Sequence, residues 1–309
     1  MTGLASTVYG VDFGAGKRDA GRKTWLARGT VDSDGVHVND CETVASAFDG
    51  GPTGRDEALS ALVEFLSGEK PWVADDGDEY RVGTDAAVGL DFPFGLPTAV
   101  LGAEFENWSA FVERFPDGLP LPDEWDHDEV DDPRSLSAWG SQRARENDEA
   151  DCVHCKRETD ATVGAQPPYG IVGKYITYHG IVSVLSEIRD AVTFAPMETG
   201  DDTDSANGPI VLEAYPAGTL GRLGLYRSGY KGGEETERRR RERNLQGLQQ
   251  GEPAVEITES IRDDAAGDTG GDALDAVVAA VATYGATRSA EALEPDEDHY
   301  DHREGYIYV

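Results

Sequence analysis

The chain has few cysteines, few basic residues and no long apolar run, and each shortage excludes a class of protein. Three cysteines in 309 residues are too few for a disulfide framework. No run of about 18 apolar residues occurs, so we expect no transmembrane helix and no membrane partner. The first residues, MTGLASTVYGVDFG, lack the basic start and apolar stretch of a signal peptide. These absences predict a soluble, cytoplasmic protein.

Basic residues are outnumbered, with 27 Lys and Arg against 60 Asp and Glu and a formal net charge of -33. The acids lie in segments that also carry Val, Ile, Leu and aromatic residues at regular spacing, which indicates a folded protein with an acidic surface. Such a surface is typical of proteins from organisms that accumulate salt inside the cell. A nucleic-acid-binding protein normally shows a basic face. In molar salt, however, the Debye length falls to about 3 Å, so local contacts would carry binding.

Apolar periodicity and turn residues predict alternating strands and helices. Strands are expected at 8–13, 24–31, 36–38, 86–92 and 210–215, with Asp34-Gly35 as a hairpin turn and the closing YIYV as a last strand. Helical spacing occurs at 56–66, 107–115, 174–189, 233–249 and 271–284. The Pro- and Asp-rich region 103–170 is interpreted as an insertion or lid. This order predicts one α/β domain over 1–309, with helices on both faces of a mixed sheet.

Three acidic residues occupy the same kind of position in the predicted sheet. Asp12 in VYGVDFG, Asp91 in AVGLDFPFG and Glu213 in IVLEAYP each lie at or near the end of an apolar strand. The carboxyl ends of strands are where ligands bind in open α/β sheets. A carboxylate in an apolar strand is costly unless a partner compensates its charge. Converging strands would therefore gather negative charge that calls for a cation.

A fourth contribution comes from the Ala-rich helix predicted at 271–284. Asp272 and Asp275 are three residues apart, which places both carboxylates on one helix face. Asp272 follows two glycines and could alternatively be the N-cap of this helix. Oxygen ligands favour Mg²⁺ or Mn²⁺, and two such ions about 3.5–4 Å apart can activate water and stabilise a leaving oxygen. We expect Asp12, Asp91, Asp272 and Asp275 to hold the metals, and Glu213 to bind metal or position water.

The pieces GVDFGAG, GLDFPFGLP, LEAYPAGTL, YKG, GDALDAVVAAV and EGYIYV, taken in this order, resemble the family called domain of unknown function 429. That family is classed as predicted ribonuclease-H-like nucleases. The helix GDALDAVVAAV also resembles the last catalytic helix of RuvC-type Holliday junction resolvases. The resemblance implies a ribonuclease-H-like fold with an acid on the first strand (Asp12), one on the fourth (Asp91) and one or two on the closing helix (Asp272, Asp275). Glu213 matches the Glu of the family's E-x-Y-P motif.

A local excess of basic residues follows the Glu213 motif. Between Arg222 and Arg243 lie eight basic residues against four Glu. They are interpreted as a grip on the phosphates of DNA or RNA, with Lys231 as the main contact and Arg238 and Arg239 beside it. Lys156 and Arg157, next to the insertion, are further candidates. The alternative is a helix face with Glu234–Arg238 and Glu235–Arg239 ion pairs.

The sequence also offers a set of zinc ligands, which is the less favoured interpretation of these residues. Cys152 and Cys155 have C-x2-C spacing, and His299 and His302 could complete a tetrahedral set. The two pairs are far apart in the sequence, and reduced, unliganded thiols are the favoured state.

The acid pattern favours a metal-dependent nuclease that hydrolyses phosphodiesters. One alternative is an actin-like or sugar-kinase-type ATPase, in which residues 12–16 (DFGAG) would form a phosphate loop. Pro93 and Phe94 stand where a second, Gly-rich phosphate turn would be expected. The other alternative is a non-catalytic binding protein of the same fold. The sequence leaves open DNA against RNA or a junction as substrate, and the oligomeric state.

Overall fold

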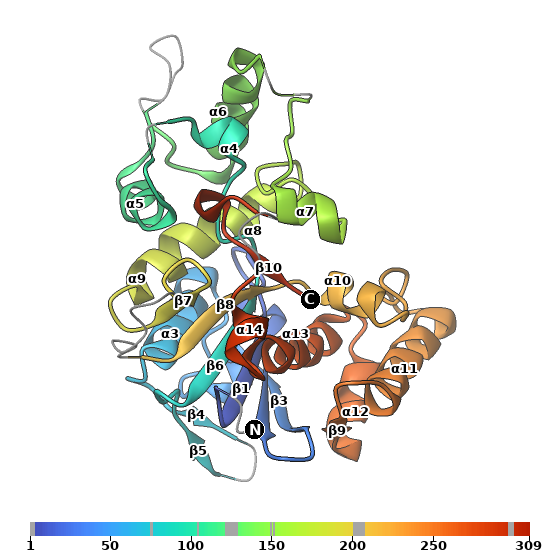
Figure 1. The fold of residues 1–309 in the computed structure, drawn as a ribbon. Helices are drawn as coiled ribbons and strands as arrows, with labels where there is room; N and C mark the ends of the chain where they lie inside the picture. The colour runs from blue at the N-terminus through green and yellow to red at the C-terminus, as the bar shows by residue number, and fades with distance from the viewer. Residues whose placement is uncertain are drawn as a thin grey trace.

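The computed structural model describes residues 4–74, 77–103, 105–120, 129–148, 150, 152–199, 208–295 and 300–309. Helices cover a mixed sheet of eight strands, so the chain has an α/β fold (Figure 1). The strands of this sheet are β1 (Thr7–Asp12), β2 (Trp25–Val31), β3 (Val36–Thr43), β6 (Ala86–Asp91), β7 (Thr193–Ala195), β8 (Ile210–Ala214), β9 (Val255–Ile257) and β10 (Ile307–Tyr308). Two further strands, β4 (Trp72–Val73) and β5 (Glu79–Tyr80), pair with each other.

Helices fill most of the remaining described chain. In chain order they are α1 (Ala20–Lys23), α2 (Val44–Ala47), α3 (Arg55–Leu66), α4 (Thr98–Leu101), α5 (Trp108–Arg114), the 3₁₀ turn η1 (Phe115–Asp117), α6 (Pro133–Glu146), α7 (Glu158–Val163), α8 (Gly173–Gly180), the π-helical segment η2 (Ile181–Leu185), α9 (Ser186–Ile188), α10 (Pro216–Arg222), α11 (Glu235–Gln250), α12 (Glu259–Gly267), α13 (Asp272–Thr287), α14 (Ala290–Leu293) and the 3₁₀ turn η5 (His302–Glu304). None of the described helices combines the length and the apolar character needed to cross a bilayer.

The first strand lies in the middle of the sheet. The strand order is β10-β8-β6-β1-β2-β3-β9, and β7 also pairs with β8. β1, β2 and β3 form an antiparallel meander, whereas β6 runs parallel to β1 and β8 runs parallel to β6. The carboxyl ends of β1, β6 and β8 therefore meet at the same edge of the sheet.

Most of the predicted elements are confirmed. β1, β2, β6 and β8 are apolar runs ended by a glycine, a proline or a polar turn, and each lies where the pattern placed it. Strand β3 is longer than the predicted 36–38, because after a register shift its pairing with β2 continues from Asp40 to Thr43. The helix predicted at 174–189 is present as α8, η2 and α9. The other described elements, among them helices α6, α7 and α12 and strands β7 and β9, are additional to the prediction.

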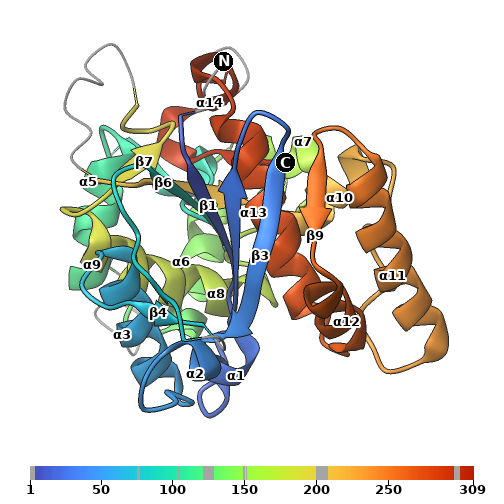
Figure 2. The ribbon, with the colours of Figure 1, turned by 90° about the horizontal axis from the view of Figure 1, so that it is seen from below.

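Side chains of β1 alternate between two hydrophobic layers. Tyr9 points toward α3, where its ring meets Phe65 with centroids 5.3 Å apart. Val8 and Gly10 point the other way, toward α13. Figure 2 shows α3 and α9 on one side of the sheet and α13, α11 and α12 on the other.

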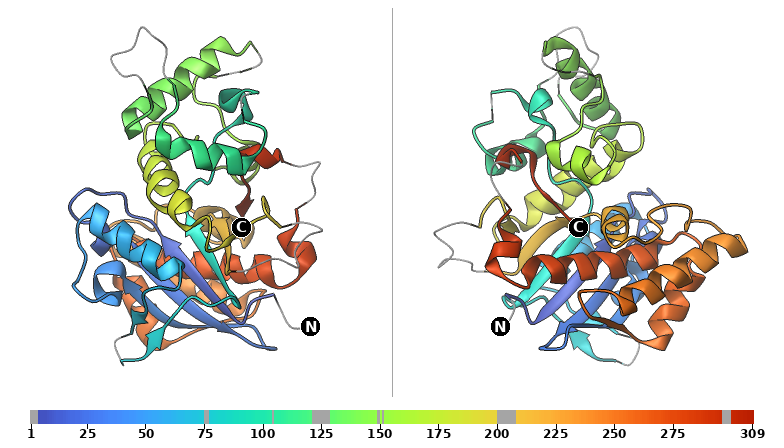
Figure 3. Two further views of the ribbon diagram at one scale, coloured as in Figure 1. Left: turned by 90° about the vertical axis from the view of Figure 1, so that its left-hand side faces the viewer. Right: turned by 45° about the vertical axis from the view of Figure 1, so that its right-hand side comes forward.

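The helices between β6 and β7 gather beyond the carboxyl ends of the central strands (Figures 1 and 3). The region 103–170, predicted as an insertion, lies among them, apart from its residues 104, 121–128, 149 and 151, which are outside the described chain. The C-terminal segment joins this region to the sheet. Glu304 accepts hydrogen bonds from the amides of Thr98 (2.6 Å) and Glu158 (2.9 Å), and β10 then pairs with β8.

Candidate metal centre

Asp12 and Asp91 lie side by side at the ends of two parallel strands. The register of β1 and β6 pairs Asp12 with Asp91. Because successive side chains of a strand alternate, Asp12 shares the face of Gly10, and Asp91 shares the face of Gly89. Asp12 is buried and Asp91 is partly exposed.

Two glycines bring α13 against this face of the sheet. A Cβ atom at Gly10 would lie 2.1 Å from the carbonyl oxygen of Ala276, and one at Gly89 would lie 2.1 Å from Oγ1 of Thr283. A larger residue at Gly10 would displace the helix backbone, and one at Gly89 would displace the Thr283 side chain. The many alanines of α13 have short side chains, so the helix itself also allows a close approach to the sheet. The backbone of α13 therefore lies directly on β1 and β6, with its first turn beside Asp12.

The first turn of α13 carries Asp272 and Asp275, and a different residue caps it. The Asp268 carboxylate accepts hydrogen bonds from the amides of Asp272 (2.7 Å) and Ala273 (3.1 Å). Gly271 occupies the N-cap position with a left-handed φ of 76°. The alternative interpretation of Asp272 as the N-cap is therefore wrong, since Asp268 makes the capping bonds and leaves the Asp272 carboxylate to face the site.

Asp12, Asp272 and Asp275 form a carboxylate cluster. One carboxylate oxygen from each lies within 4.8 Å of the others, and Asp12 and Asp275 are buried. The ammonium of Lys231 lies 2.7 Å from Oδ2 of Asp275 and 3.2 Å from Oδ1 of Asp272. The hydroxyl of Tyr230 donates to Oδ1 of Asp275 (2.8 Å). Counting Asp91 beside Asp12, four carboxyl groups stand against the single ammonium of Lys231.

Burial and mutual repulsion shift the pKa values in this cluster. Burial, and then the charges of Asp275 and Asp91, raise the pKa of Asp12 well above its usual range. Burial and the charge of Asp275 raise the pKa of Asp91 to about 8. Burial also raises the pKa of Asp275, although Lys231 opposes this shift. Without a further cation the cluster therefore retains protons near neutral pH.

The Lys231 loop is held by an arginine of α11. Buried Arg241 donates to the carbonyl oxygens of Tyr230 (2.5 Å), Gly232 (3.0 Å) and Ala266 (3.0 Å). These bonds fix the backbone on both sides of Lys231, whose side chain remains about half exposed. Burial lowers the pKa of Lys231, but the charges of Asp275 and Asp12 outweigh burial and raise it. Lys231 thus stays charged at the edge of the cluster.

Arg238 and Arg239 pair within α11. Arg239 lies 2.9 Å from Glu235, which is one of the ion pairs proposed as the alternative to phosphate binding. Arg238 pairs with Glu242 (3.2 Å) and not with Glu234. Both arginines are exposed. Within the described chain, these ion pairs link the two arginines to α11 and not to the carboxylate cluster.

Glu213 does not join the cluster. In the pairing of β6 with β8, Glu213 is opposite Leu90, so its side chain points to the face away from Asp12 and Asp91. Its oxygens receive two bonds from Arg157 (2.5 and 2.7 Å) and one from the amide of Phe94 (2.8 Å). The expectation that Glu213 binds metal or positions water is corrected by this pairing.

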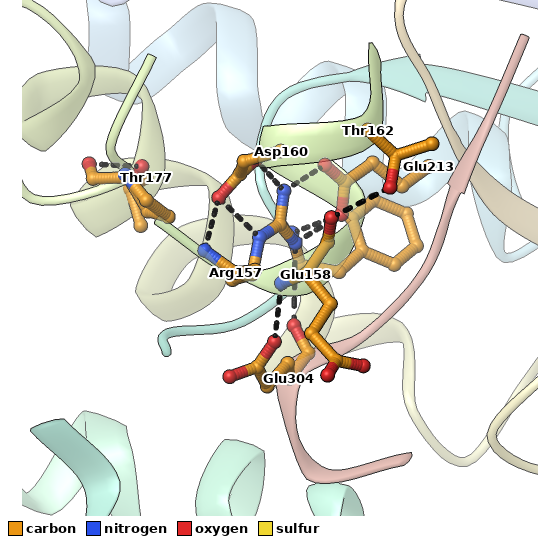
Figure 4. Close-up of polar contacts among 9 residues, drawn as sticks. Arg157, Glu158, Asp160, Thr162, Thr177, Glu213 and Glu304 are labelled. Carbon is orange, nitrogen blue, oxygen red and sulfur yellow. Dashed lines mark hydrogen bonds and ion pairs between the residues drawn. The ribbon is translucent and has the colours of Figure 1, made fainter. Parts of the chain in front are cut away.

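Arg157 is fully buried and cannot contact a phosphate from solvent. Figure 4 shows its guanidinium between Asp160 and Glu213, with Glu304 beside it. The prediction of Arg157 as a substrate contact is therefore wrong. It failed because a basic residue next to a predicted insertion was assumed to be on the surface. Lys156 is exposed, and no contact within the described residues links it to the cluster.

Three residues of the site were missed in the sequence. Tyr230 is part of the YKG motif, in which the charged neighbour Lys231 is the more obvious candidate. Asp268 stands four residues before Asp272, and a carboxylate just before a Gly-Gly helix start is a capping signal. Arg241 carries no such signal, because nothing local separates it from the exposed arginines beside it.

The cysteine and histidine candidates do not assemble in the part of the chain that is described. Cys155 is buried, with its thiol donating to the carbonyl oxygen of Cys152 (3.0 Å). His302 contacts the Tyr300 hydroxyl (3.0 Å). His299 lies outside the described residues. Among the residues that are described, the group with metal-ligand spacing is Asp12, Asp272 and Asp275.

Comparison of the chain with protein-family models, with curated proteins and with solved structures finds no match. The function must therefore be argued from the geometry of the carboxylate cluster.

Proposed function

We propose that the chain is a divalent-metal-dependent nuclease of ribonuclease-H-like fold that hydrolyses phosphodiesters in DNA or RNA. The observation that carries this proposal is the convergence of Asp12, Asp91, Asp272 and Asp275 at the junction of two parallel strands and one helix. These residues are separated by up to 263 positions in the sequence. Gathering them costs electrostatic energy, and a cation would offset that cost.

The topology of the sheet supports the fold part of the proposal. A meander of three antiparallel strands is followed by two strands parallel to the first, in the spatial order β3-β2-β1-β6-β8. That is the strand order expected for a ribonuclease-H-like sheet. The resemblance of the motifs to the domain of unknown function 429 family rests on the same positions, since Asp12 ends the first of these strands and Asp91 ends the fourth.

The residues present fit a hard divalent cation. All the candidate ligands are carboxylate oxygens, which suit Mg²⁺ or Mn²⁺, and no thiol or imidazole belongs to the described cluster. Asp12, Asp91, Asp272 and Asp275 would hold one or two ions. When bound, the ions would supply an activated water and neutralise charge on the phosphodiester.

The protein's own residues account for the orientation of the substrate. The half-exposed ammonium of Lys231 is placed to pair with a phosphate oxygen next to the carboxylates. The Tyr230 hydroxyl donates to Asp275 and holds its carboxylate in one orientation. Arg241 fixes the loop that carries both residues. A cluster of acids flanked by one half-exposed ammonium suits hydrolysis of a phosphodiester.

The ATPase alternative is less well supported. A phosphate loop presents free amides to the nucleotide, but the amide of Gly14 already donates to Oγ1 of Thr24 (3.1 Å). The non-catalytic alternative shares the same geometry, so turnover must decide between it and the nuclease.

Cleavage assays in molar KCl with Mg²⁺ or Mn²⁺ test the proposal, using labelled single- and double-stranded DNA and RNA. Asp12→Asn should lose cleavage by at least about a hundredfold while remaining folded. The matched control is Asp56→Asn, which removes the same charge from a side chain that is 94% exposed, and it should cleave as the wild type does. Titration calorimetry with Mn²⁺ gives an independent readout. Full cleavage by Asp12→Asn would refute the site, and Mn²⁺ binding without turnover on any substrate would favour the non-catalytic alternative.

A further inference from the structure

A cavity of about 220 Å³ opens beside the carboxylate cluster. Asp91 lines it, and Asp91 is paired in the sheet with Asp12 of the cluster. The other lining residues belong to the segment after β6, to α7, α8 and the loop between them, to the carboxyl end of β8 and to β10. The cavity therefore lies where the inserted helices meet the sheet, next to the proposed position of the scissile phosphate.

The walls of the cavity are mostly apolar. Ala165, Pro167, Ile176 and Ile307 contribute aliphatic surface, and the Tyr215 ring lies at the β8 side. Val172 lines the mouth and is 78% exposed. An apolar cavity of about 150 Å³ holds a benzene molecule, and drug-sized ligands occupy about 300–1,000 Å³. The space fits one planar ring system.

The floor of the cavity excludes an anion. All the N–H groups of Arg157 are engaged, since it makes five bonds to Asp160, Glu213 and the carbonyl oxygen of Glu304 (Figure 4). Two carboxylates stand against this one guanidinium, so the floor offers no free positive charge. A phosphate would be repelled, whereas an uncharged ring would meet no unsatisfied group.

The mouth of the cavity offers polar recognition. The exposed amide of Gln166 can both donate and accept a hydrogen bond. The ring of half-buried Tyr215 provides an aromatic face. Base recognition commonly combines an aromatic face with an amide that reads the base edge.

We propose that this cavity receives the base of a nucleotide whose phosphate lies at the carboxylate cluster, and that the substrate strand is therefore single-stranded or locally unpaired. The inference rests on the proposed nuclease function. A base inside a duplex is stacked and paired, so it would have to leave the helix to enter the cavity. Asp91 joins the two sites, so one nucleotide spans both.

The test compares two single-stranded substrates that differ at one position. The first carries all its bases, and the second carries an abasic residue at the site of cleavage. The wild-type protein should cleave the intact strand at least about tenfold faster, and should prefer it to the same strand in a duplex. Because this comparison uses the unmodified protein, it does not depend on the folding of a variant. DNA and RNA versions of the pair are tested in parallel.

A variant of the cavity tests whether the preference for the intact strand arises there. Ala165→Phe fills the space and replaces none of the carboxylates, and it should reduce cleavage of the intact strand to the abasic rate. Ala161→Phe adds the same ring at an exposed position of α7, and should behave as the wild type does. A strand with 2-aminopurine at the cleavage position should change its fluorescence on binding to the wild type and to Ala161→Phe, but not to Ala165→Phe.

Two failures can be told apart. Metal-dependent cleavage that is equal for intact, abasic and duplex substrates, and is unchanged in Ala165→Phe, would overturn the base cavity and leave the nuclease function in place. Absence of both Mn²⁺ binding and cleavage of every substrate would refute the nuclease function, and the base cavity with it.

Discussion

Replacing Asp91 by Asn tests whether the carboxylate cluster holds an extra proton when no cation is bound. Burial and the charge of Asp275 raise the pKa of Asp91 to about 8, against about 3.9 for an exposed Asp. Between these two pH values the folded protein keeps a proton that the unfolded chain has released. The amide introduced by Asp91→Asn has no proton to release.

The sign of the effect follows from this proton. Because the folded state binds one more proton, the free energy of unfolding falls as the pH rises, by about 1.4 kcal/mol per pH unit. The contribution of Asp91 is complete below about pH 4 and is lost above about pH 8. From pH 5 to 8 the full loss would be about 4 kcal/mol. Since Asp91 is partly exposed, we expect about 2 kcal/mol after screening by solvent. The Asp91→Asn variant should gain that amount relative to the wild type.

Urea unfolding at pH 5, 6, 7 and 8, in molar KCl with EDTA, measures the difference. The same series with Mn²⁺ should reverse it, because the ion displaces the proton and stabilises only the wild-type site. Asp56→Asn serves as the control, and its stability should run parallel to that of the wild type. Parallel curves for Asp91→Asn and the wild type in EDTA would refute the reasoning.

Three further changes test the packing and charges around the site. Gly10→Ala should lower the unfolding free energy by about 2 kcal/mol in thermal unfolding, whereas Gly285→Ala, with open space around it on α13, should raise it by about 0.5–1 kcal/mol. Arg157→Met should cost about 3–5 kcal/mol in urea unfolding, and adding Glu213→Gln should recover part of the loss; no recovery would contradict the ion pair. Lys231→Met should tighten Mn²⁺ binding by roughly tenfold in calorimetry, because it removes a cation that competes for the carboxylates. It should also slow cleavage, because it removes the phosphate contact. Unchanged affinity and rate would show that Lys231 neither competes with the metal nor contacts the substrate.

The sequence could predict the elements that local patterns encode. The apolar runs that end at Asp12 and Asp91 are broken by glycine or proline, so their ends were placed correctly. The Ala-rich run after Gly271 likewise predicted helix α13, with Asp272 and Asp275 on one face of it. These features depend only on neighbours within a few residues.

The other features of the site depend on strand pairing and packing between segments that are far apart in the sequence. Glu213 has the same apolar context as Asp91, but the pairing of β6 with β8 shifts it by one residue and turns it to the opposite face. The burial of Arg157 depends on Asp160 and Glu213, of which Glu213 is 56 positions away. The fixing of the Lys231 loop by Arg241 likewise depends on how α11 packs against that loop. No local pattern encodes these contacts.

Helix α13 packs closely on Gly10 and Gly89, and this packing sets the spacing between the carboxylates of the helix and those of the sheet. At Gly10 the distance between the strand that carries Asp12 and the helix that carries Asp275 is set by the backbone of Ala276 and Ala280. Ligand distances for Mg²⁺ and Ca²⁺ differ by only about 0.3–0.5 Å. If the cluster binds a metal as we propose, substitutions beneath the helix, remote from every carboxylate, should therefore change which ion it selects.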